Sequence, residues 1–195
     1  MAVQNPLTSL ADDVAAARRA MESAKGPVVL VGHSWGGAVI TQAGADDKVK
    51  ALVYVAAFAP DAGQSVNDLL QLGPAPAWAA SLRKDSAGFL TLPAEVVAND
   101  FAQDLPAADT KIMAATQGPW AERCAGEALS VAAWKDKPSW YVLAANDHMI
   151  DPAAQARMAE HIDATVTRVS ASHVPMLSHP EDVAAAIVAA ADAIH

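Results

Sequence analysis

The chain has 195 residues, of which 53% are hydrophobic and 18% are charged. This length allows one domain with a sizeable core, and this composition excludes a disordered chain. The net charge of -9 at pH 7, with lysines and arginines scattered singly, argues against a surface for nucleic acids or anionic membranes.

Three features bear on the cellular compartment. Cys124 is the only cysteine, which excludes an internal disulfide and a cysteine-based metal cluster and fits a reducing compartment. The first residues lack a basic segment followed by an apolar one, and the longest apolar run, Val183 to Ala191, is too short to span a bilayer. We therefore expect a cytoplasmic protein.

The first third of the chain predicts helices and strands in alternation. Ser9 and Asp12 form a helix start signal, and the helix is expected to stop at Gly26-Pro27. Residues 28–31 are a short, mostly β-branched run, which predicts a strand covered on both faces. A second helix is expected from about Ser34 to residue 45, and a second buried strand over residues 49–58.

The last third repeats this pattern. Strands are predicted at 140–145 and 165–169, and between them a helix begins with Asp151 as N-cap and Pro152 at its first position. Ser178 and Glu181 have capping-box spacing at the start of a final helix. Strands that alternate with helices of this length are typical of an α/β fold with a parallel sheet.

Residues 62–137 interrupt the alternation. This segment holds short helical pieces at 66–71 and 94–101 between prolines and glycines. We interpret it as a helical cap inserted between two core segments, 1–61 and 138–195, of a single domain. An apolar pocket could be roofed by large cap side chains, although each is individually more often a core residue. These are Trp78, Phe89, Phe101, Met113, Trp120 and Trp134.

The chemistry is concentrated at Ser34. The run from Gly32 to Gly36 matches Gly-x-Ser-x-Gly and lies between a predicted strand and a helix, where a sharp turn lifts the serine hydroxyl above the sheet. Gly32 and Gly36 are expected to remove side chains that would collide there. At a helix N-terminus an oxyanion is stabilised, and the backbone N–H of Trp35 is the expected first oxyanion donor.

A serine nucleophile needs a base and an orienting acid. His173 follows the last predicted strand and Asp147 follows the strand at 140–145, so both emerge at the same sheet edge as Ser34. The order Ser34, Asp147, His173 is that of α/β-hydrolases. The competing residues are assigned other roles, with His33 expected to turn away from the base and His161 and His195 expected in helices. His148 is assigned to an exposed loop, His179 to a helix start and Asp151 to an N-cap.

Three segments carry a family resemblance. Gly-His-Ser-Trp-Gly-Gly from Gly32, the run 52–60 and the run 172–180 resemble small bacterial α/β-hydrolases related to plant methylesterases and hydroxynitrile lyases. The resemblance implies an α/β-hydrolase fold with a mostly parallel sheet, flanking helices and a cap. It also implies hydrolysis of small, apolar esters by the triad above, without a metal or organic cofactor.

One departure from the family concerns the first residues. Members begin with a strand and a His-Gly loop that supplies a second oxyanion N–H, whereas Met1-Ala-Val resembles the end of a later strand. We therefore expect an N-terminally truncated fold with the strand at 28–31 as an open edge. Three explanations are open: the protein is longer than this sequence, another chain covers the edge, as in a homodimer, or activity is much reduced. Loss of one oxyanion donor typically raises the barrier by about 2.7 to 4 kcal/mol.

Other functions have less support in the sequence. The alternative that is not an enzyme is a catalytically weak hydrolase fold that serves as a binding module. The missing oxyanion loop is the reason for considering it. Hydroxynitrile lyases of this fold have a lysine at the position of Val174, which argues against lyase activity. Cofactor-free perhydrolysis would use the same triad, so the sequence leaves this activity open. The sequence lacks the phosphate-loop motif of nucleotide-binding proteins. It also lacks the histidine spacings that are typical of catalytic metal sites.

Overall fold

The main sheet is parallel and four-stranded. The computed structural model describes residues 1–194, and its main sheet consists of β1 (Val28–His33), β2 (Val49–Val55), β6 (Ser139–Ala144) and β7 (Thr165–Val169). The strands lie in the order β1-β2-β6-β7, and each adjacent pair is parallel. The predicted α/β class and parallel sheet are therefore confirmed.

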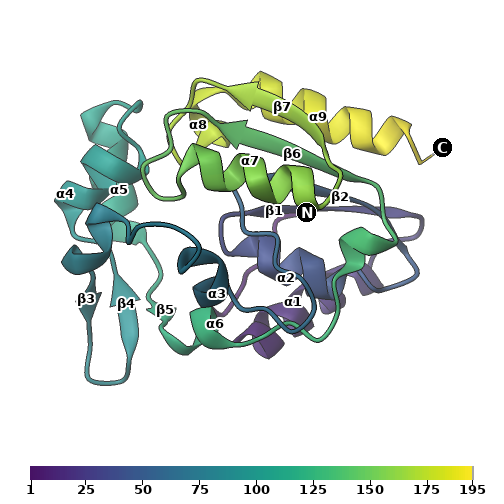
Figure 1. Ribbon diagram of the computed structural model, residues 1–195, viewed down its shortest axis with the longest axis horizontal. Helices are drawn as coiled ribbons and strands as arrows, with labels where there is room; N and C mark the ends of the chain where they lie inside the picture. The colour runs from purple at the N-terminus through teal and green to yellow at the C-terminus, as the bar shows by residue number, and fades with distance from the viewer. Residues whose placement is uncertain (195) are drawn as a thin grey trace.

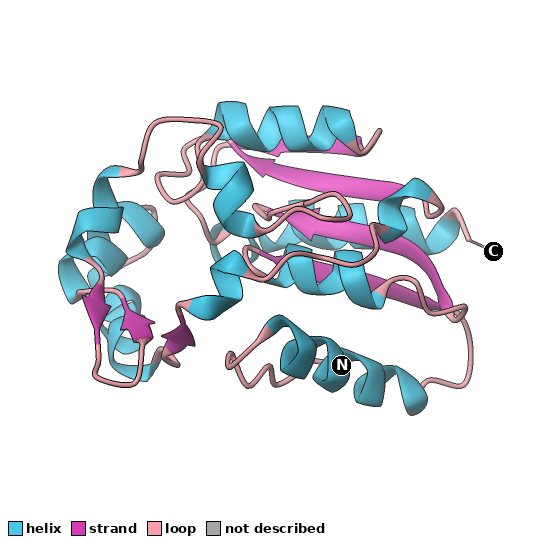
Figure 2. Ribbon diagram, turned by 60° about the horizontal axis from the view of Figure 1, so that its bottom comes forward, coloured by secondary structure: helices cyan, strands magenta, loops and turns pink. Residues whose placement is uncertain are grey.

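Helices cover both faces of this sheet (Figures 1 and 2). The helices α1 (Leu10–Glu22), α2 (Gly36–Ala43) and α7 (Pro152–His161) pack on one face, and α9 (Pro180–Asp192) packs on the other. Successive residues of β2 and β6 point to opposite faces, which produces two separate apolar cores. None of the helices in the described range is long and apolar enough to cross a bilayer.

The capping signals that depend on neighbouring residues are mostly confirmed. The Ser9 hydroxyl accepts the N–H of Asp12 at the start of α1, and the Asp151 carboxylate accepts the N–H of Ala153 at the start of α7. The predicted capping box of Ser178 and Glu181 is wrong. A short helix α8 (Pro175–Ser178) precedes α9, and Pro180 takes the first position of α9, so residue 179 is the N-cap.

The strand β1 lies at an edge of the main sheet, as expected for residues 28–31, but the prediction that both of its faces are covered is wrong. Its only strand partner in the described range is β2, and Val31 is 43% exposed, so the strand is not covered on both faces. The opposite edge strand β7 exposes Val166 to a similar degree, 47%. A homodimer through β1 remains a prediction. The strand expected over 49–58 stops at Val55, where Ala56 adopts a φ of +42°.

The inserted segment contains strands as well as helices. An antiparallel sheet of three short strands, which the sequence did not predict, lies with two helices on the side toward which β6 and β7 point (Figure 1). Strands of two or three residues are too short to show a period. The elements are α3 (Val66–Leu70), η1 (Ala77–Ser81), β3 (Arg83–Lys84), β4 (Phe89–Thr91), α4 (Ala94–Val96), η2 (Val97–Phe101), α5 (Ala107–Thr116), β5 (Trp120–Ala121), α6 (Arg123–Gly126) and η3 (Ala133–Lys135).

Candidate active site

Ser34 lies in the junction between β1 and α2. It is a non-glycine residue with a φ of +52°, in the left-handed region that costs an L-residue roughly 1–2 kcal/mol. Three backbone hydrogen bonds hold this conformation. Ser34 N–H donates to Val55 O at 3.3 Å, and Ser34 O accepts from the N–H groups of Gly37 at 3.0 Å and Phe58 at 3.1 Å. The strained serine is thus tied to the end of β2.

At two positions of the junction, backbone segments lie so close together that only glycine fits. A Cβ on Gly32 would lie 2.4 Å from Gly36 O, and a Cβ on Gly37 would lie 2.1 Å from Phe58 O. The expectation for Gly36 is wrong, because a Cβ at that position would have no atom within 4 Å. The second glycine that the turn requires is therefore Gly37, which packs against the segment after β2.

Asp147 and His173 form a buried hydrogen-bonded pair. His173 Nδ1 lies 2.8 Å from Asp147 Oδ2, and the two residues are 1% and 3% exposed. The other carboxylate oxygen, Oδ1, accepts the N–H groups of Met149 at 2.7 Å and Ile150 at 3.0 Å. Because the carboxylate accepts at Oδ2, Nδ1 of His173 is the donor, and this leaves Nε2 with a lone pair for accepting a proton.

His33 contacts His173, contrary to the sequence expectation. The two rings lie 4.7 Å apart, and His33 Nε2 lies 2.7 Å from the carbonyl oxygen of His173. A carbonyl only accepts, so His33 Nε2 carries a proton. Burial, followed by repulsion from a charged His173, lowers the pKa of His33 to about 3. His33 is therefore neutral and joins the elbow to the histidine loop.

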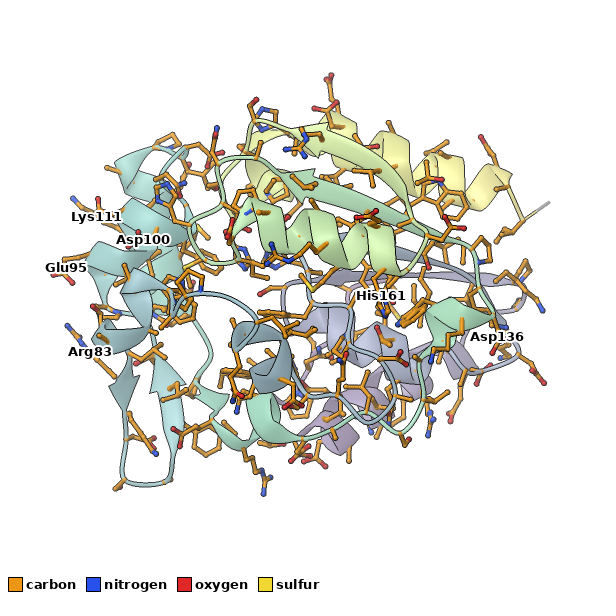
Figure 3. All side chains as sticks on the ribbon, in the orientation of Figure 1. Arg83, Glu95, Asp100, Lys111, Asp136 and His161 are labelled. Carbon is orange, nitrogen blue, oxygen red and sulfur yellow. The ribbon has the colours of Figure 1, made fainter. Side chains whose placement is uncertain are left out.

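Asp151, His148 and His161 take the roles that the sequence assigned to them. The exception is His179, whose side chain does not cap the helix that follows it. Asp151 is an N-cap, and His148 is exposed, with its Nδ1 atom 3.5 Å from the carboxylate of Asp100. His179 occupies the N-cap of α9, but its side chain makes no capping bond. His161 lies at the end of α7 in Figure 3, and His195 lies outside the described residues.

The structure joins two of the three predicted triad members directly. Within residues 1–194, no hydrogen bond connects the Ser34 side chain to His173, although His173 packs against His33, the residue before Ser34. Such bonds are often long without substrate and shorten when it binds. Trp35 N–H donates to no acceptor in the described range, which fits the oxyanion role predicted for it.

Known proteins share this architecture. A family model described as "Alpha/beta hydrolase family" matches residues 4–186. The chain belongs to the alpha/beta hydrolase family. A probable hydrolase R7 from Phoma sp. is 30% identical over 193 residues, which cover 90% of this chain and 76% of that protein.

Solved structures of alpha/beta hydrolases show the same fold. A pyrethroid hydrolase from Sphingobium faniae superposes with a TM-score of 0.79 at 24% identity, covering 95% of this chain and 79% of that one. Polyneuridine aldehyde esterase superposes with a TM-score of 0.78 at 18% identity, covering 94% of this chain and 80% of that one.

A cavity of about 410 Å³ opens beside Ser34 of this alpha/beta hydrolase. Its wall is mainly apolar and includes Leu30, Val39 and Ile40. Of the cap side chains expected to roof a pocket, Phe101 lines this one, and its ring lies 5.0 Å from that of His173. A second cavity, of about 370 Å³, lies between α3 and α7, and Ser34 is not among its lining residues.

The π-helical turn η2 and the residues after it contact the loops that carry Asp147 and His173. Gln103 Nε2 donates to Asn146 O at 2.6 Å, next to Asp147 in the chain. Asp104 Oδ2 accepts the N–H of Ser172 at 2.8 Å, next to His173. Gln103 and Asp104 of the segment 62–137 therefore hold the loops beside both residues, which the sequence alone did not indicate.

Proposed function

We propose that this hydrolase cleaves carboxylic esters with Ser34 as nucleophile, His173 as base and Asp147 as orienting acid. The observation that carries the proposal is the hydrogen-bonded pair of Asp147 and His173, which lies against the elbow where Ser34 adopts its strained backbone. All three residues follow parallel strands of one sheet, so their side chains emerge at the same edge.

The reaction proceeds in two halves. His173 Nε2 takes the proton of the Ser34 hydroxyl as the oxygen attacks the ester carbonyl, and Trp35 N–H donates to the developing oxyanion. Collapse breaks the bond to the alcohol, which leaves with the proton from His173. Water then attacks the acyl-serine, with His173 again as base, and releases the acid and free Ser34. Asp147 stabilises the charged imidazole in both halves.

The cavity beside Ser34 supports the proposed substrate class. Its mainly apolar wall and volume of about 410 Å³ suit a small, apolar ester. The names of two structural relatives, a pyrethroid hydrolase and polyneuridine aldehyde esterase, support hydrolysis of an ester but do not fix its identity.

A chain-length series tests the proposal. We expect hydrolysis of p-nitrophenyl esters from acetate to octanoate, with a fall in kcat/KM once the acyl chain exceeds the cavity. Ser34→Ala should lower kcat on the order of a millionfold, leaving only the residual rate that oxyanion stabilisation and substrate binding supply. Ser86→Ala is the matched control, because Ser86 is exposed in the cap and should leave the rate unchanged.

A covalent probe separates the enzyme from its main alternative. A fluorophosphonate should label wild type at Ser34 and should not label Ser34→Ala. A folded wild-type chain that neither reacts with the probe nor hydrolyses any ester would contradict the proposal and favour a binding module with a hydrolase fold.

A further inference from the structure

Gln155 is a buried polar residue of α7 that the proposed reaction does not use. Its side chain is fully buried. Nε2 donates to Asp147 Oδ2 at 2.7 Å and to Ile150 O at 2.9 Å, while Oε1 accepts the N–H of Ala144 at 3.1 Å. Because two partners only accept and the third only donates, the amide has one orientation that satisfies all of them.

These bonds span the loop that carries Asp147. Ala144 is the last residue of β6, Ile150 lies at the far end of the loop, and Asp147 lies between them. The Gln155 side chain therefore joins both ends of the loop and its central carboxylate to α7. An aliphatic residue of the same size would remove this partner from Ala144 N–H and Ile150 O and would leave Asp147 Oδ2 with one donor instead of two, each at a considerable cost.

The bond to Asp147 does more than satisfy buried groups. Oδ2 accepts from both Gln155 Nε2 and His173 Nδ1, whereas Oδ1 accepts two backbone N–H groups. With two donors on each oxygen, rotation of the carboxylate would break several bonds at once. The oxygen that faces His173 is thus fixed before the imidazole takes up a proton, a form of preorganisation that lowers the barrier.

We propose that Gln155 is a positioning residue that holds Asp147 Oδ2 toward His173. This inference rests on the proposed function, since it assigns Gln155 a part in the same reaction. Gln155 acts through Asp147 and His173 and does not touch the substrate. Its loss should therefore lower kcat and leave KM nearly unchanged.

Two variants test the role. Gln155→Met removes all three hydrogen bonds, and Gln155→Glu retains the volume and an acceptor for Ala144 N–H but, when ionised, loses the donor to Asp147. We expect kcat to fall about 10- to 100-fold in both, with KM within about twofold of wild type. Gln155→Glu keeps the test informative if Gln155→Met does not fold.

A matched control exists in the cap. Gln117 also makes three hydrogen bonds, in its case all to backbone groups, with Oε1 accepting from Leu92 N–H and Nε2 donating to Leu92 O and Ala114 O. Gln117→Met removes the same kind of bonds without touching Asp147. It should lower stability and leave kcat within about twofold.

Proton NMR gives a readout that does not depend on turnover. The proton between His173 Nδ1 and Asp147 should give a low-field resonance that is absent in His173→Gln. It should shift or broaden in both Gln155 variants and stay unchanged in Gln117→Met. Folded Gln155 variants with the wild-type resonance and wild-type kcat would overturn the inference. Activity that survives Ser34→Ala would instead overturn the proposed function and leave the resonance test intact.

Discussion

Two regions of the candidate site hold their functional groups in different ways. Ser34 is held by backbone geometry, with a left-handed φ, three backbone hydrogen bonds and two glycines that permit close contact. Asp147 and His173 are held by a buried network of side-chain hydrogen bonds. The elbow should therefore be sensitive to added volume, and the acid-base pair should be sensitive to lost donors and acceptors.

The largest expected effect concerns the elbow. Gly37→Ala places a Cβ 2.1 Å from Phe58 O, a backbone atom that cannot move away without shifting the segment that holds Ser34. We expect the free energy of unfolding to fall by about 3 kcal/mol or more, with loss of ester hydrolysis. Urea denaturation measures the first effect and the ester assay the second.

Gly36→Ala is the matched control for this prediction. A Cβ there meets no atom within 4 Å, and the residue begins α2, where alanine is favoured over glycine by roughly 0.5–1 kcal/mol. Stability should therefore be unchanged or slightly raised. If both alanine variants unfold at the same urea concentration, steric exclusion at residue 37 does not define the elbow.

The next prediction concerns a hydrogen bond within the elbow region. Trp35 Nε1 donates to Oδ2 of the buried Asp13 at 2.7 Å, and Leu7 N–H donates to Oδ1 at 2.8 Å. Desolvation raises the pKa of Asp13, and these two bonds oppose the rise. Trp35→Phe removes one donor from a buried carboxylate, so we expect a loss of about 2 kcal/mol in the free energy of unfolding at pH 7.

The pH dependence of that loss identifies its cause. A carboxyl whose folded pKa is raised destabilises the fold while it is ionised, and this cost disappears as the pH falls through the folded pKa. The deficit of Trp35→Phe should therefore shrink on acidification from pH 7. Trp78→Phe is the control, because its indole donates to the neutral backbone carbonyl of Met149 at 3.1 Å, and its deficit should not change with pH in this way. An equal, pH-independent deficit in both variants would exclude Asp13 as the cause.

Much of the fold could be predicted because its signals are local. The caps at Ser9 and Asp151 and the apolar runs of β2 and β6 depend on residues close in the chain, and the structure contains them. The placement of Asp147 and His173 at one sheet edge followed from the parallel topology. The strands β3 to β5 are only two or three residues long and left no comparable local pattern, and β4 pairs with β5 across 30 to 32 residues.

The missed parts of the site depend on distances between segments remote in sequence. Gly37 is required because Phe58 lies against it, and His33 matters because it reaches the carbonyl of His173. Gln155 occupies a helix position where a polar side chain in the sequence suggests exposure, yet it is fully buried against Asp147. Gly37 and His33 lie within the Gly-His-Ser-Trp-Gly-Gly run, but neither this run nor the helical pattern around Gln155 shows which remote residues they contact.

The smallest expected effect concerns the anchor between the cap and the histidine loop. Burial alone would raise the pKa of Asp104, but hydrogen bonds from Ser172 and Ser178 outweigh it and lower that pKa. A carboxyl with a lowered folded pKa stabilises the fold above its unfolded pKa of about 3.9, and this stabilisation is lost as the pH falls through the folded pKa. Asp104→Ala should therefore cost about 1 kcal/mol at pH 7, since the side chain is exposed and screened, and almost nothing below the folded pKa.

The activity of Asp104→Ala tests whether the cap contributes to the acid-base pair. Ser172 N–H, which Asp104 accepts, belongs to the residue before His173, so loosening this bond should lower kcat several-fold while the buried bond between His173 and Asp147 persists. Asp47→Ala, an exposed turn residue remote from the cap, is the control and should change neither quantity. A kcat equal to wild type, with the expected loss of stability, would mean that the hydrogen bonds of Asp147 alone fix His173 and that the cap shapes only the cavity beside Ser34.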